Sequence, residues 1–121
     1  ENGTGLSRIA NAARCSWVGL RATWRTQAAF RQEACLGFVL VPASMLLGRS
    51  TIERAALICV WLLVLAVELL NTGLEAVVDR IGPERHELSG LAKDAGSAAV
   101  LVSFLVATLL WLAVAWDRFI T

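Results

Sequence analysis

AGSAAVLVSFLVATLLWLAVAW, residues 95–116, is a stretch of 22 residues without a charged side chain. At a helical rise of about 1.5 Å per residue, such a stretch spans roughly 33 Å and crosses the hydrocarbon core of a bilayer. The chain of 121 residues is 57% hydrophobic and only 17% charged. It is therefore too short for two ordinary domains and too apolar for an ordinary soluble one. These features predict a small membrane protein.

Two further stretches are candidates for crossing the membrane. Residues 55–78 are of similar length, but polar side chains interrupt their second half. Residues 34–48 number only 15 and contain Pro42, so this span needs residues 28–33 as an extra turn and a half. We expect one membrane domain over residues 1–121, with spans at about 28–48, 54–80 and 91–117.

The segment before the spans, at about 5–26, predicts an amphipathic helix that lies on the membrane surface. Its apolar residues recur at steps of three and four from Leu6 to Trp24, and arginines flank this stripe. Tryptophan suits the interface, because its apolar ring and its N–H group can both be accommodated there. The alternative is a soluble helix packed on a small protein core, which fits poorly with three following spans.

Charge distribution predicts the orientation in the membrane. Eight of the 11 basic residues lie before the first span, at its first turns (Arg31) or in the loop at 79–94, and three lie on the other side. Because cytoplasmic loops carry the excess of Lys and Arg, the N-terminus and that loop are expected in the cytoplasm.

Composition also excludes several classes of protein. The 11 basic and 10 acidic residues give a net charge of +1, and no basic tract suggests nucleic-acid binding. The cysteines at 15, 35 and 59 are odd in number and widely spaced, so they predict neither a disulfide framework nor a metal knuckle.

Polar residues in the second span form the main candidate site. At 100° per residue, Glu68, Asn71, Glu75 and Asp79 fall within roughly 80° of arc, one above the other. Carboxylates inside a membrane are costly unless they are paired, hydrated or liganded. Carboxylate and amide oxygens without His or Cys suit a hard divalent cation such as Mg²⁺. The structural alternative is that Arg31 or Lys93 pairs with these carboxylates.

The third span opens with a second candidate site. Lys93 and Asp94 lie at its beginning, where a lysine and a helix N-terminus can hold a phosphate group. They can equally be a helix cap and an interfacial anchor. His86, the one histidine, can contact a ligand or simply be a solvated loop residue. The sequence has no G-x-x-x-x-G-K-[ST] motif, so any nucleotide site differs from that of soluble kinases.

Four sequence blocks carry a resemblance to a known family. They are RCSWVGLRATW (14–24), AAFRQE (28–33), ELLNTGLEAVVDRIG (68–82) and HELSGLAKDAGSAAVL (86–101). They closely resemble the prokaryotic integral-membrane diacylglycerol kinase family, particularly its Gram-negative type, over nearly the whole chain. The resemblance implies an all-α homotrimer in the bacterial inner membrane, each protomer with three spans and an N-terminal amphipathic helix. It also implies transfer of the γ-phosphoryl group of ATP to diacylglycerol, which gives phosphatidic acid.

The resemblance assigns roles to individual residues. It implies that Glu68 is the general base, that Glu75 is a Mg²⁺ ligand and that Asn71 lies between them. Lys93 and Asp94 match nucleotide-binding positions. Further positions match contacts with nucleotide: Arg8, Cys15, Gln27, Glu84, Arg85 and His86. Others match the surroundings of the lipid substrate: Arg8, Trp17, Arg21, Trp24, Phe30, Arg31, Gln32, Glu33, Glu68 and Ser97.

One position departs from the family pattern at the expected metal site. Gln27 stands where the family has a glutamate that shares the metal with the residue matching Glu75. A neutral amide oxygen is a weaker magnesium ligand than a carboxylate. Either Gln27 ligates through its carbonyl or a water, or the enzyme is slow, or the change was introduced. Arg85 and Cys15 also replace residues that are often aromatic.

Three alternative functions remain open at this point. An undecaprenol kinase would use the same carboxylate site for a longer alcohol, although GLRATW and AAFRQE favour diacylglycerol. A cation or proton carrier would use Glu68 and Glu75 as a relay. A non-catalytic membrane subunit would bind a partner through its Ala- and Gly-rich helices.

Overall fold

The computed structural model describes residues 4–83 and 86–121. Within these residues every regular element is an α-helix, and three segments are long and apolar enough to cross a membrane. The expectation of an all-α protein with three such helices is confirmed. In chain order the helices are α1 (Gly5–Thr26), α2 (Ala28–Cys35), α3 (Gly37–Leu47), α4 (Thr51–Ile81) and α5 (Glu87–Ile120).

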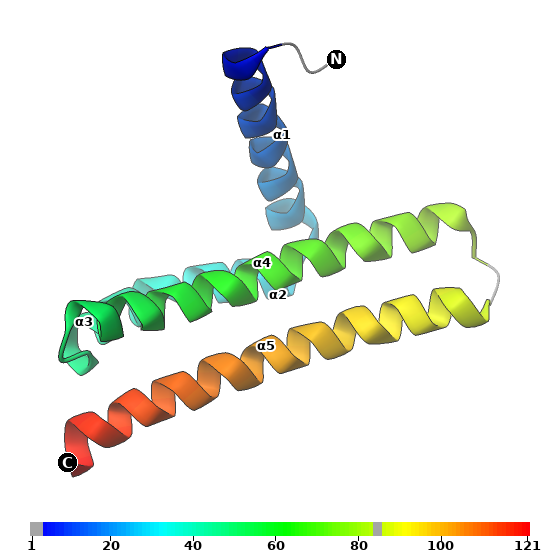
Figure 1. Ribbon diagram of the computed structural model, residues 1–121. Coiled ribbons are helices and arrows are strands. Elements are labelled where there is room, and N and C mark those ends of the chain that lie inside the picture. The colour runs from blue at the N-terminus through cyan, green and yellow to red at the C-terminus, as the bar shows by residue number, and fades with distance from the viewer. Residues whose placement is uncertain (1–3, 84–85) are drawn as a thin grey trace.

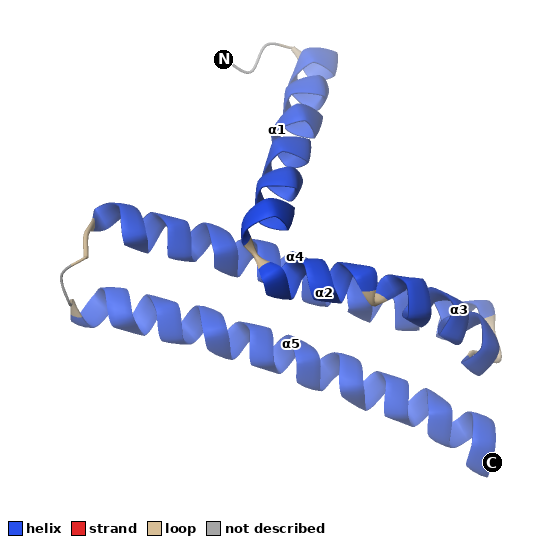
Figure 2. Cartoon of the chain, turned by 180° about the vertical axis from the view of Figure 1, so that it is seen from behind, coloured by secondary structure: helices blue, strands red, loops and turns tan. Residues whose placement is uncertain are grey.

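The three candidate spans form an elongated bundle. α4 and α5 run side by side in opposite directions, and α2 and α3 follow one another along α4 (Figure 1). Seen from behind, α2 and α3 lie in front of α4 (Figure 2). They therefore pack on the face of α4 that is turned away from the viewer in Figure 1. α4 therefore forms the centre of the bundle, since it contacts every other helix.

α1 stands at a steep angle to the bundle and leaves it partway along α4 (Figure 1). The bend is at Gln27, whose extended backbone (φ −117°, ψ 104°) separates α1 from α2. Arg31 stabilises the bend, because its Nη1 donates to the carbonyl oxygens of Trp24 at 2.7 Å and Arg25 at 3.2 Å. These carbonyls at the end of α1 otherwise lack helical partners. Arg31 therefore does not neutralise the polar residues of α4.

Local sequence determines where α4 and α5 begin and end. The Ser50 hydroxyl accepts from the backbone N–H of Glu53 at 3.1 Å, which caps α4. α4 ends at Gly82, whose φ of 157° favours glycine. His86 caps α5, since its Nδ1 accepts from the backbone N–H of Leu88 at 3.1 Å. His86 is therefore a capping residue as well as an exposed one.

The length of α4 sets the depth of its polar residues. Its 31 residues span about 46 Å, which exceeds the roughly 30 Å of a hydrocarbon core. Glu68 lies 17 residues after the first residue of α4, or about 26 Å along the axis. If the core begins near the start of α4, Glu68 lies close to the opposite membrane boundary, and the last turns of α4 lie outside it.

The bundle buries little of its own apolar surface. Leu57 and Val64 of α4 are buried, yet Phe38 is 84% exposed and Leu109 is 68% exposed. Apolar exposure on this scale needs lipid or further protein around it. The trimer that the resemblance implies would cover part of this surface, and it stays a prediction.

Candidate active site

A line of polar residues, here called the polar stripe, follows the second half of α4. It consists of Glu68, Asn71, Glu75 and Asp79, in order from the middle of the bundle toward the α4–α5 loop. The first three side chains are half-buried, and that of Asp79 is 68% exposed. The stripe thus runs from the expected membrane boundary toward water.

Glu33 of α2 joins the stripe at its inner end. Its carboxyl group lies against that of Glu68, and its Oε1 is buried without a hydrogen-bond donor among the described residues. Two ionised carboxylates in contact repel each other, so this pair needs a proton, a hydroxyl donor or a cation between its oxygens. The Glu33–Glu68 pair is therefore suited to receive an O–H group.

Asn71 packs against α5. Its Oδ1 is buried without a hydrogen-bond donor in the described chain, and it packs directly on Gly96 of α5. A Cβ atom at Gly96 would overlap this oxygen and would also lie 2.9 Å from Leu74 Cδ2. Glycine at position 96 therefore lets α4 and α5 approach closely here.

We expect Gly96→Ala to lower the stability of the protein in detergent, because the new methyl group must displace Asn71 and Leu74. Overpacking costs about 1–3 kcal/mol where the neighbours stay in place, and rotation of the Asn71 and Leu74 side chains offsets part of this cost. Gly73→Ala is the matched control, since a Cβ atom at Gly73 meets nothing within 4 Å. Thermal unfolding followed by circular dichroism should show a lower midpoint for Gly96→Ala only. Equal midpoints for the two variants would contradict this packing.

The outer end of the stripe holds an ion pair beside a polar cleft. Lys93 Nζ of α5 lies 2.8 Å from Asp79 Oδ1, and Glu75 is close enough to attract the same ammonium group. Lys93 thus pairs with a stripe carboxylate, as the structural alternative predicted, but with the outermost and most exposed one. The cleft has a volume of about 810 Å³, and its polar lining includes Asp79, His86, Ser89, Lys93 and Asp94.

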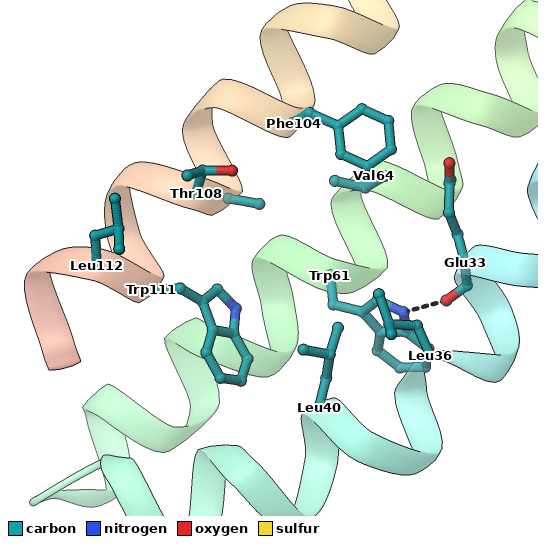
Figure 3. A pocket seen from close by; sticks show the side chains of 10 residues that line it. Glu33, Leu36, Leu40, Trp61, Val64, Phe104, Thr108, Trp111 and Leu112 are labelled. Atoms are coloured by element: carbon teal, nitrogen blue, oxygen red, sulfur yellow. Dashed lines mark hydrogen bonds between the residues drawn. The ribbon is translucent and has the colours of Figure 1, made fainter.

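An apolar cavity of about 320 Å³ lies beside Glu33 (Figure 3). Leu36, Leu40, Val64, Phe104 and Trp111 are among its lining residues, and Glu33 is the one charged residue among them. Such a lining offers a phosphate group no cationic side chain and places the Glu33 carboxyl beside it. The polar cleft is therefore the better candidate for a nucleotide.

The candidate residues on α1 lie apart from the stripe. The first half of α1, which carries Arg8 and Cys15, points away from the bundle (Figure 1). Trp17 and Arg21 follow in the next turns and are exposed, as is Trp24. Within one chain, the part of α1 that carries Arg8 and Cys15 does not approach the polar stripe.

The remaining candidates take several positions. Phe30 is buried, Gln32 and Ser97 are exposed, and Gln27 is half-buried at the α1–α2 bend. Glu84 and Arg85 lie outside the described residues.

The donor set of the stripe fits a magnesium ion. Among the described residues no group of three His, Cys, Asp or Glu side chains gathers at one point. Glu75 and the unpartnered Oδ1 of Asn71 nevertheless offer a carboxylate and an amide oxygen one turn apart. Magnesium commonly takes one or two carboxylates and completes its ligands with water and substrate phosphates. The stripe can therefore hold the ion together with a nucleotide.

Sequence reasoning missed two contacts of the site. It did not foresee that Glu33 touches Glu68, nor that Trp61 of α4 donates from Nε1 to the carbonyl oxygen of Glu33 at 2.8 Å (Figure 3). The helical period orders residues along one helix, but it says nothing about which residue of another helix faces them.

Comparison with known proteins identifies relatives along nearly the whole chain. The family described as prokaryotic diacylglycerol kinase matches residues 14–115. The diacylglycerol kinase of Escherichia coli is 51% identical over 119 residues, which cover 98% of each chain. That of Pseudomonas aeruginosa is 53% identical over 108 residues, covering 89% of this chain and 88% of the relative. That of Haemophilus influenzae is 45% identical over 108 residues, covering 89% and 92%.

Proposed function

Because the chain belongs to the prokaryotic diacylglycerol kinase family and is a lipid kinase, we propose that it converts diacylglycerol to phosphatidic acid with ATP. The lipid hydroxyl oxygen attacks the γ-phosphorus in line, and the bond from this phosphorus to the β–γ bridging oxygen breaks. ADP leaves with the electron pair of that bond, and the hydroxyl proton passes to Glu68. Membership of a kinase family sets aside the carrier and the non-catalytic subunit.

The Glu33–Glu68 pair is the observation that carries this proposal. The two carboxyl groups lie within reach of each other, and the buried Oε1 of Glu33 has no donor among the described residues. A lipid hydroxyl between them would donate to one carboxylate, here Glu68, while its oxygen stays free to attack. Glu33 then orients the lipid, in agreement with the lipid-side role that the resemblance implies.

The outer end of the stripe is suited to the nucleotide. The cleft lined by Lys93 and Asp94 is large and polar, and the ammonium group of Lys93, once it turns inward from Asp79, can neutralise charge on the transferring phosphoryl group. Glu75 and Asn71, together with Gln27 at the position that the resemblance assigns to the metal, would hold magnesium, which supplies charge neutralisation at the phosphates when bound. His86 lies at the same cleft, and we keep Glu84 and Arg85 as nucleotide contacts.

The angle of α1 supports the proposed membrane position. An amphipathic helix lies in the plane of the interface, and α1 leaves the bundle just before Glu33, which touches Glu68. The interface then lies near this pair, and the cleft with Lys93 lies on the aqueous side. With the positive-inside rule, we propose that this side, together with the N-terminus, is the cytoplasm and that the membrane is the bacterial inner membrane.

We further propose a homotrimer whose sites are completed between protomers. The part of α1 that carries Arg8 and Cys15 points away from its own bundle (Figure 1). In a trimer, Arg8 and Cys15 would reach the nucleotide at the site of a neighbouring copy, and the exposed Trp17 and Arg21 would contact lipid. The exposed apolar faces of the bundle would lie against the neighbours.

The proposed reaction is tested with mixed micelles that contain either diacylglycerol or undecaprenol, each with ATP and with or without Mg²⁺. We expect phosphatidic acid from diacylglycerol only when Mg²⁺ is present. Faster phosphorylation of undecaprenol would instead identify the alternative kinase. No transfer to either lipid would contradict the proposed function.

We expect Gln27→Glu to lower the Mg²⁺ concentration that gives half-maximal activity severalfold, because a carboxylate replaces a neutral ligand at the position that the resemblance assigns to the metal. Thr26→Glu adds the same charge at the neighbouring exposed residue and serves as the control. Magnesium titrations of the three proteins in one micelle composition provide the measurement. A titration unchanged by Gln27→Glu would show that residue 27 does not reach the metal.

A further inference from the structure

The first span is interrupted at Leu36, more than two turns after the bend at Gln27. α2 ends at Cys35, and α3 begins at Gly37. The backbone N–H of Leu36, between them, donates to the carbonyl oxygen of Gln32 and makes the last helical hydrogen bond of α2. In an unbroken α-helix the carbonyl oxygen of Glu33 would accept from the backbone N–H of residue 37. The interruption leaves this carbonyl to another donor. In the apolar interior of a membrane, a carbonyl without any donor is costly.

Trp61 of α4 supplies the donor. Its indole Nε1 donates to the carbonyl oxygen of Glu33 at 2.8 Å (Figure 3). Its ring lies directly on Gly37, where a Cβ atom would overlap the six-membered ring. The indole therefore both satisfies the carbonyl and fills the space above the first residue of α3. One side chain of α4 holds the backbone on each side of the interruption.

The residue whose carbonyl Trp61 holds is the one whose carboxyl touches Glu68. α4 thus meets Glu33 at two points: Trp61 binds its backbone carbonyl, and Glu68 faces its carboxyl group. These two residues of α4 lie about 10 Å apart along the helix axis. We propose, on the basis of the kinase function above, that Trp61 is a positioning residue that holds Glu33 in register with Glu68.

Removing the indole N–H should weaken this register. Without that donor, the Glu33 carbonyl can regain a partner only if residue 37 bonds to it and the interruption closes. Closure would turn α2 relative to α3 and move the Glu33 carboxyl away from Glu68. Phenylalanine keeps an aromatic ring on Gly37 but has no donor, so Trp61→Phe removes the hydrogen bond with the least change in packing.

Trp111 provides a matched control within the same cavity. It lines the cavity from α5, it is half-buried like Trp61, and its indole makes no hydrogen bond within the described residues. Figure 3 shows the two rings on different helices of the cavity wall. Trp111→Phe therefore removes the same atoms from the cavity lining and leaves the hydrogen bond to the Glu33 carbonyl in place.

Kinetic analysis of the two variants tests the role of Trp61. We expect Trp61→Phe to lower kcat for diacylglycerol about tenfold, as for loss of one buried hydrogen bond, with the KM for ATP within about twofold of the parent value. Trp111→Phe should leave kcat within about twofold. In a Glu33→Gln background, Trp61→Phe should cause no further loss, because a residue that acts through Glu33 has nothing left to position. Equal losses in the two tryptophan variants, or full additivity with Glu33→Gln, would overturn the proposal.

A second measurement does not depend on activity. We expect the Trp61 indole N–H, observed by ¹⁵N NMR of the parent protein in micelles, to exchange with D₂O much more slowly than that of Trp111. Equal exchange would overturn the hydrogen bond and the proposal with it. A parent protein with a protected Trp61 indole that forms no phosphatidic acid would instead contradict the proposed function, so the two failures are distinguishable.

Discussion

Glu68→Gln should reduce phosphatidic acid formation about a thousandfold, because general-base catalysis commonly contributes factors of this size. Glutamine has nearly the same shape as glutamate, but its amide cannot take the proton from the lipid hydroxyl. The contact with Glu33 can persist, since the amide donates a hydrogen bond to a carboxylate. We expect loss of turnover without loss of the fold.

Nucleotide binding separates this effect from damage to the whole site. Glu68 lies at the inner end of the polar stripe, away from the cleft of Lys93 and Asp94. Calorimetric titration with a non-hydrolysable ATP analogue and Mg²⁺ should therefore give similar affinities for the parent and Glu68→Gln. Glu53→Gln, at the other end of α4, is the matched control and should retain activity. Near-parent turnover in Glu68→Gln would remove Glu68 as the base.

Lys93→Met should lower kcat about a hundredfold or more, as removal of one preorganised donor to developing charge does in other enzymes. Methionine keeps an unbranched chain but presents no charge to the phosphoryl group. The expected loss lies mainly in kcat, because the developing charge on the transferring group is greatest in the transition state. Steady-state kinetics with varied ATP provide the measurement.

The ion pair of Lys93 calls for its own control. Lys93→Met also removes the ion pair with Asp79, and Asp79→Asn removes the charge pairing while keeping the lysine. Both side chains are largely exposed, and such pairs contribute little to stability in water. Asp79→Asn should stay within about fivefold of the parent rate. Equal losses in the two variants would assign the effect to the ion pair rather than to phosphate contact.

Features that depend on one helix at a time could be predicted from the sequence. The uncharged run at 95–116 predicts α5, and the spacing of Glu68, Asn71 and Glu75 predicts the polar stripe. These predictions rest on residue hydropathy and on the helical period, which are local properties. The resemblance to the family then supplies roles that spacing alone leaves open.

Contacts between helices could not be predicted in the same way. Pro42 is the obvious helix breaker of the first span, yet α3 continues through it and the interruption comes at Leu36. The donor that satisfies the interrupted backbone is Trp61, which lies 28 residues from Glu33 in sequence. The position of Glu33 against Glu68 likewise depends on how α2 packs on α4. Such long-range partners follow from packing, which no local pattern reports.

The most direct test of the account is the stereochemistry of phosphoryl transfer, measured with ATP whose γ-phosphorus is chiral through oxygen isotopes. Direct in-line attack by the lipid hydroxyl, with Glu68 as base, predicts inversion of configuration in phosphatidic acid. Retention would require two transfers through a phosphorylated residue. Retention would contradict the role of Glu68 as a general base that accepts only the hydroxyl proton. It would show instead that a side chain of the enzyme attacks the γ-phosphorus first.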